Sequence, residues 1–159
     1  MISLNDIIEN YINANSQNCE GKYFTSIFGG KIVINKDLYN NPPIKYNFDS
    51  EKNIFKALMQ FDAELMDADP KEILFQTKLE NKLQRPNIFH NGKKIPEESL
   101  NHLNKYLDWI AKDRIDWNQL RHGNLIAGQM LKSISGRIHL ENLNNEKYNV
   151  KTSVEFPFE

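Results

Sequence analysis

The stretch YNVKTSVEFPF, residues 148–158, decides the fold class of this chain. Every second side chain in it is apolar, aromatic or a threonine, which is the period of a β-strand with one face in a core. The residues of that face are Tyr148, Val150, Thr152, Val154, Phe156 and Phe158. A second alternating run contains Ile138 and Leu140, and turn-forming residues 143–146 lie between the two runs. We therefore predict a C-terminal pair of strands.

A β-hairpin is predicted near the N-terminus as well. Residues 22–28 and 31–35 are rich in aromatic and β-branched side chains, and only Gly29-Gly30 separates them. Two glycines can adopt the positive φ angles that tight hairpin turns require. Residues 44–48 alternate and predict a further short strand. Strands at both ends of the chain are joined most simply in one antiparallel sheet.

Helical spacing of apolar residues marks the segments between and beside these strands. The predicted helices begin at Ser3, Asp49, Asp69, Pro96 and after Asp116. The third of them starts with an Asp-Pro pair, a capping carboxylate followed by proline, and Arg85-Pro86 is expected to end it. We predict a single α+β domain over residues 1–159, with about five helices, mostly central, packed on one face of an antiparallel sheet.

Composition excludes several classes of protein. The formal net charge is −1 and the basic residues are scattered, so nucleic acid is not an expected partner. Cys19 is the single cysteine, so no disulfide can form within the chain. No apolar run approaches the roughly 20 residues of a membrane span, and the N-terminus lacks the pattern of a signal peptide. We expect a cytoplasmic protein, from a bacterial or phage source, that does not contact a membrane.

No cofactor or metal site is predicted. The four histidines, at positions 90, 102, 122 and 139, include no pair with the i, i+4 spacing of a helical zinc site. The acidic residues that follow Asp62 lack the glycine and glutamate that a calcium loop needs at its sixth and twelfth positions. Gly29-Gly30 has no following Gly-Lys-Ser or Gly-Lys-Thr pattern.

These absences favour a protein-binding module, such as an inhibitor or an immunity or antitoxin-like protein that occludes a partner with a basic active site. Acidic and aromatic side chains suit that contact. The predicted contact residues are Asp62, Asp67, Asp69, His102, Tyr106, Trp109, Trp117 and Arg121. The same acidic residues fit a solvated helix end, and the same tryptophans fit a core, so both interpretations stay open.

An enzyme is the alternative, namely a hydrolase acting on a phosphoester or nucleotide with a histidine-based site assembled from distant residues. The candidate catalytic residues are His122 with Arg121, and His139 with Glu141. The second pair points to one side of a predicted strand, where histidine and carboxylate can exchange protons near neutral pH. A second alternative is a phage or secretion-system assembly protein that uses the C-terminal strand as a contact edge.

Overall fold

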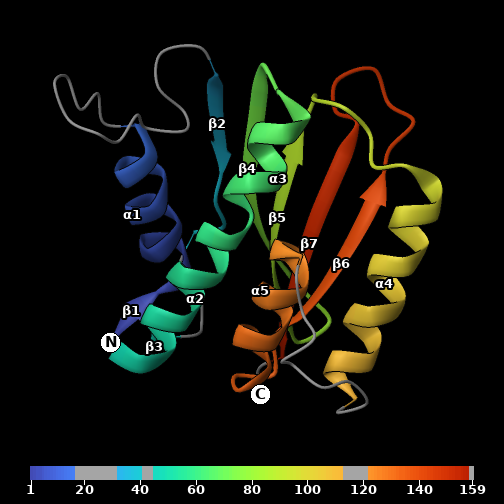
Figure 1. Ribbon diagram of the computed structural model, residues 1–159. Coiled ribbons are helices and arrows are strands. Elements are labelled where there is room, and N and C mark those ends of the chain that lie inside the picture. The colour runs from blue at the N-terminus through green and yellow to red at the C-terminus, as the bar shows by residue number, and fades with distance from the viewer. Residues whose placement is uncertain (17–31, 41–44, 113–121, 158–159) are drawn as a thin grey trace, which may run out of the picture.

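The computed structural model describes residues 1–16, 32–40, 45–112 and 122–157, and within them a five-stranded sheet carries helices on one face (Figure 1). The strands, in spatial order, are β2 (Val33–Asp37), β4 (Glu72–Glu80), β5 (Leu83–His90), β7 (Val150–Pro157) and β6 (Arg137–Asn142). A separate pair joins β1 (Ile2–Ser3) to β3 (Lys45–Tyr46). The predicted combination of a sheet with helices is confirmed, as are the two strands near the C-terminus.

The sheet is mixed, so the prediction of a wholly antiparallel sheet is wrong. Strand β2 runs parallel to β4, whereas the β4–β5, β5–β7 and β7–β6 pairs are antiparallel. Helices lie between β2 and β4 in the chain, and such a crossover returns the chain in its original direction. The predicted strand over residues 22–28 and the Gly29-Gly30 turn lie outside the described residues.

The helices follow the apolar stripes of the sequence and cover one face of the sheet (Figure 1). Ser3 Oγ accepts a hydrogen bond from the Asp6 N–H at 3.2 Å, as expected of a residue that caps the first helix. Asn47 Oδ1 accepts from the Ser50 N–H at 2.9 Å at the start of the second helix. The helices are α1 (Leu4–Ser16), α2 (Phe48–Gln60), α3 (Asp62–Ala68), α4 (Glu97–Ala111) and α5 (Gly123–Lys132).

The helix predicted from Asp69 to Arg85 is wrong, because this segment forms the β4–β5 hairpin. Asp69 instead ends α3, in the left-handed conformation with a φ of 50°. The tight turn between the strands consists of Asn81 and Lys82, with φ angles of 50° and 61°. Such a turn usually contains glycine, so its sequence signal is weak here.

The two faces of the sheet differ in chemistry. The face under the helices is apolar, and its largest fully buried side chains include Phe75 and Phe156. The opposite face has polar residues in rows across the strands. In one row Gln76 donates to Asp37 at 3.2 Å, and Asn87 donates to Gln76 at 3.1 Å. None of the helices in the described ranges has the length and apolar character that a bilayer span requires.

Candidate functional site

A cavity of about 80 Å³ lies between the helix-covered face of the sheet and the surrounding helices α3, α4 and α5. Most of its lining is apolar, and a few polar groups reach it. The lining includes Glu64, Leu65 and Ala68 of α3, Ile88 and His90 of β5, Lys93, Leu103 of α4, His122, Leu140 of β6, and Val150 and Thr152 of β7. Mostly apolar pockets with a few convergent polar groups are the usual form of small-ligand sites.

The floor of the cavity follows from strand register. Ile88 pairs with Thr152, and Thr152 pairs with Leu140 on the other side. His90 pairs with Val150 in the adjacent row. Residues two apart on a strand share a face, so these two rows place five side chains on the helix-covered side of the sheet.

His90 contributes a hydrogen-bonding group to this floor. The side chain is only 6% exposed, and its Nδ1 accepts a hydrogen bond from the Gly92 N–H at 3.0 Å. A nitrogen that accepts carries no proton, so we assign the ring proton to Nε2. Burial lowers the pKa of His90 from its ordinary 6.5 to about 4, so the ring is neutral at neutral pH. Among the described residues, no hydrogen bond uses the Nε2–H.

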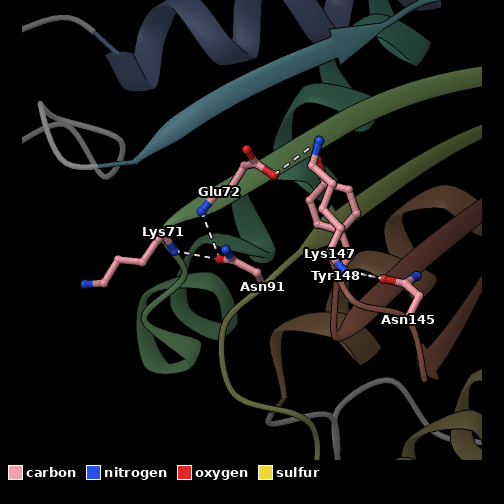
Figure 2. A network of polar contacts seen from close by, with 6 residues as sticks. All are labelled: Lys71, Glu72, Asn91, Asn145, Lys147 and Tyr148. Carbon is pink, nitrogen blue, oxygen red and sulfur yellow. Dashed lines mark hydrogen bonds and ion pairs between the residues drawn. The ribbon is translucent and has the colours of Figure 1, made fainter.

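Side-chain amides hold the loop that follows His90. Asn91 Oδ1 accepts hydrogen bonds from the backbone N–H groups of Lys71 at 2.8 Å and Glu72 at 2.9 Å (Figure 2). Asn149 Nδ2 donates to the Gly92 carbonyl at 2.8 Å. The loop is therefore tied both to the start of β4 and to the chain that enters β7, which keeps the histidine in one position.

Two glycines let backbone segments approach the cavity walls closely. A Cβ on Gly92 would lie 2.4 Å from the Ala68 carbonyl oxygen, at the end of α3. A Cβ on Gly123 would lie 2.3 Å from the Gln60 carbonyl oxygen and 2.7 Å from Glu64 Oε2. Real Cβ atoms do not come this close to backbone oxygens, so both positions require glycine.

The start of α5 already holds a carboxylate. Glu64 Oε1 accepts a hydrogen bond from the Gly123 N–H at 3.2 Å, where the helix dipole favours negative charge. His122 Nδ1 lies 3.4 Å from the same oxygen and also accepts from the Asn124 N–H at 3.2 Å. A nitrogen that accepts the Asn124 N–H carries no proton, so His122 Nδ1 and Glu64 do not form an ion pair in this arrangement. Glu64 Oε2 is buried, with no hydrogen-bond partner in the described part of the chain.

An open groove of about 370 Å³ shares Leu103 and His122 with the cavity. It also includes His102 and Tyr106 of α4 and Leu125 of α5. Pockets that enclose drug-sized ligands span roughly 300–1,000 Å³. The narrow cavity alone is smaller than that range, whereas the groove falls within it.

The structure brings together three of the sequence-predicted site residues around this groove, namely His102, Tyr106 and His122. Trp109 is half-buried and packs edge-on against Tyr106, with ring centroids 5.4 Å apart. Trp117 and Arg121 lie outside the described residues.

The predicted acidic cluster is divided. Asp62 accepts a hydrogen bond from the fully buried Tyr11 hydroxyl. Burial raises the pKa of Asp62, with a smaller raising effect from Glu64, while the bond from Tyr11 lowers it. Asp67 and Asp69 are exposed at the end of α3. Asp62 therefore provides a hydrogen-bond acceptor for a core tyrosine, whereas Asp67 and Asp69 lie at the surface.

The other predicted catalytic pair lies on the far side of the sheet. His139 and Glu141 are exposed and line a shallow pocket of about 190 Å³ on the face without helices. Ile138 and Leu140, which alternate with them, are buried on the helix-covered side. The structure therefore does not bring this pair together with His122.

Sequence reasoning did not identify His90, Glu64 or Thr152 as site residues. The available signal was His90-Asn91-Gly92, a polar group at the end of a strand followed by a tight loop, where binding residues often lie. The incorrect helix over residues 69–85 hid that signal, because it removed the strand that ends at His90.

No protein-family model and no curated protein matches the chain. Solved structures do match. A nucleotide-free form of the catalytic domain of the histidine kinase ThkA has a TM-score of 0.61 at 16% identity, over 97% of this chain and 91% of that one. The Acinetobacter baumannii histidine kinase AdeS has a TM-score of 0.62 at 11% identity, over 98% of this chain and 65% of that one. A blue-light activated histidine kinase of Erythrobacter litoralis has a TM-score of 0.52 at 12% identity, over 82% and 54%.

Likeness at these identities shows the fold, which resembles that of histidine kinase catalytic domains. The prediction of an inhibitor, immunity protein or antitoxin is wrong, because the ThkA structures that share the fold are catalytic domains of a histidine kinase. That prediction depended on the absence of local motifs. The cavity found here is assembled from helices and strands far apart in the chain, and such a site leaves no local motif.

Proposed function

We propose that this chain is a nucleotide-binding module. The flat ring of the ligand occupies the cavity, and its polar remainder extends into the groove. The observation that supports this most directly is the cavity itself, a small apolar space over two strand rows that shares Leu103 and His122 with an open groove. The ThkA structures with the same fold are described by their nucleotide-free state, which favours the same class of ligand.

The cavity walls suit a planar ring. Ile88 and Thr152 form one side, and Leu65 and Ala68 of α3 form the other. Apolar surfaces on both sides of a ring gain about 25 cal/mol for each Å² removed from water. The few polar groups at the cavity then set the orientation of the ring and distinguish one ring from another.

Charge at the cavity gives the ligand a direction. Lys93 lines the cavity and is exposed, so its ammonium can meet a phosphate. The Glu64 carboxylate occupies the start of α5 and repels a second anion. We therefore place the phosphate groups toward Lys93 rather than toward Glu64.

Of the alternatives that the sequence left open, the one involving a nucleotide agrees best with this fold. The proposal concerns binding, and assigns no chemical step. The proposed nucleotide site contains His90, Thr152 and Lys93, whereas the enzyme predicted from the sequence used His139 and Glu141.

The test compares two alanine-to-leucine variants of α3 by calorimetric titration with ATP, GTP and their nucleosides. Ala68→Leu adds three carbon atoms to the cavity wall, whereas Ala63→Leu adds them to an exposed position of the same helix. We expect at least one ligand to bind the unchanged protein. Ala68→Leu should weaken that binding at least tenfold, about 1.4 kcal/mol, and Ala63→Leu should leave it unchanged.

Two results would contradict the proposal. If none of the four ligands binds, the cavity does not take a nucleotide. If a ligand binds Ala68→Leu as tightly as it binds Ala63→Leu, the ligand sits elsewhere on the protein.

A further inference from the structure

We infer that the cavity selects a 6-oxopurine, the ring type of guanine and hypoxanthine, over adenine, because His90 presents a hydrogen-bond donor at the buried end. This inference rests on the proposed function and specifies its ligand. It depends on the position of the proton on the His90 ring and on the burial of that ring at the cavity.

The backbone fixes which edge of the His90 ring a ligand meets. Gly92 N–H donates to Nδ1 at 3.0 Å in a buried contact, and the Gly92 carbonyl is held by Asn149 Nδ2 at 2.8 Å. If the ring were flipped, a carbon atom would face that N–H and leave a buried donor without a partner, which is unfavourable. The Asn149 N–H donates to the His90 carbonyl at 2.8 Å and holds the backbone as well.

The opposite edge of the ring therefore carries the Nε2–H. Protonation at Nδ1 would set two N–H groups against each other, and burial already disfavours the charged ring. His90 cannot switch between donor and acceptor as an amide or hydroxyl can, so it accepts only ligands that bring an acceptor.

Thr152 does not oppose this selection. Thr152 lies in the adjacent row of the floor, and its hydroxyl can both donate and accept. A 6-oxopurine offers a carbonyl to His90 and a ring N–H to Thr152. Adenine in the same position would set its 6-amino group against the His90 N–H, leaving both donors unsatisfied.

Inosine and adenosine are the matched probes, since they differ at position 6 of the ring and in the ring proton that follows from it. Both are titrated into the full chain, with binding measured by calorimetry and by the amide resonance of Gly92. Loss of this hydrogen bond, with two donors left without acceptors, should raise the dissociation constant at least about tenfold. We expect inosine to bind at least tenfold more tightly than adenosine.

Two histidine variants locate the cause. His90→Asn replaces the donor with an amide that both donates and accepts, so the preference for inosine should fall to within about threefold. His139→Asn makes the same change on the exposed opposite face and should keep the full preference. NMR spectra of the imidazole nitrogens in the unchanged protein report the position of the His90 proton directly. This measurement does not depend on whether His90→Asn folds. The spectra should show the proton on Nε2.

The outcomes separate the inference from the proposed function. If adenosine binds as tightly as inosine, or more tightly, the inference is overturned while nucleotide binding stands. A proton on Nδ1 of His90 also overturns the inference alone. If inosine, adenosine, ATP and GTP all leave the Gly92 resonance and the calorimetric trace unchanged, both fail together.

Discussion

Replacing Gly92 with alanine should destabilise this protein, because the added methyl group has no space. Its carbon would lie 2.4 Å from the Ala68 carbonyl oxygen and 2.9 Å from the carbonyl carbon. These are backbone atoms at the end of α3, so a side-chain rotation cannot relieve the contact. The loop must move away from the helix, which strains the 2.8 Å hydrogen bond from the Lys93 N–H to the same oxygen.

The expected loss of stability follows from three terms. Overpacking costs about 1–3 kcal/mol, and a weakened hydrogen bond costs about 0.5–1.5 kcal/mol. Alanine also restricts the unfolded chain, which returns about 0.4–1 kcal/mol. The free energy of unfolding of Gly92→Ala should therefore fall by about 2 kcal/mol, measured by urea denaturation followed by circular dichroism.

Gly128→Ala is the matched control. A Cβ at that position meets Leu107 Cδ2 at 2.9 Å, the far end of a side chain that can rotate. Alanine inside a helix is favoured over glycine by roughly 1 kcal/mol, which offsets the adjustment. The control should stay within about 1 kcal/mol of the unchanged protein. A Gly92→Ala variant as stable as Gly128→Ala would refute the close approach of this loop to α3.

Three further changes test other contacts. Tyr11→Phe removes the hydrogen bond to Asp62, so the free energy of unfolding should fall by about 2 kcal/mol and the pKa of Asp62 should rise further; an unchanged carboxyl titration by NMR would contradict this. Asn104→Ala leaves unpaired an N–H and a carbonyl of the edge strand β6, bound now at 2.9 and 2.8 Å, and should cost about 1–3 kcal/mol in urea denaturation. Asn101→Ala, on the exposed side of α4, is its control and should cost nothing measurable. The pKa of His90 is lowered to about 4 in the folded state, so below its ordinary 6.5 the unfolded chain takes up a proton first. Stability should be full above pH 6.5 and fall by about 3 kcal/mol toward pH 4, and His90→Asn should remove that part of the fall.

Local patterns predicted the elements whose buried face repeats at a single period. The strands near the C-terminus, β6 and β7, alternate at period two, and α1 and α4 repeat at helical spacing after recognisable starts. The segment from Ile73 to Leu83 was ambiguous, because a short apolar run fits a helix and a buried strand equally well. Its turn residues, Asn81 and Lys82, contain no glycine to decide the matter.

The candidate site was only partly accessible to sequence reasoning. His102, Tyr106 and His122 were named in advance, for other reasons, and lie around the groove. His90 was considered only as a zinc ligand, and Glu64 was not a predicted site residue, because a histidine or glutamate has no special meaning until its neighbours are known. Their roles depend on a loop and a helix end that lie close only in the folded chain.

Strand β7 (Val150–Pro157) was thus determined by the sequence itself, together with the class of a sheet covered by helices, since burial of one face imposes a period on neighbouring residues. Tertiary structure alone decided the parallel pairing of β2 with β4 and the register that sets Thr152 beside Ile88. It also decided the cavity and the hydrogen bond from the Gly92 N–H to His90 Nδ1. These features depend on contacts between residues far apart in the chain, and no local period records such contacts.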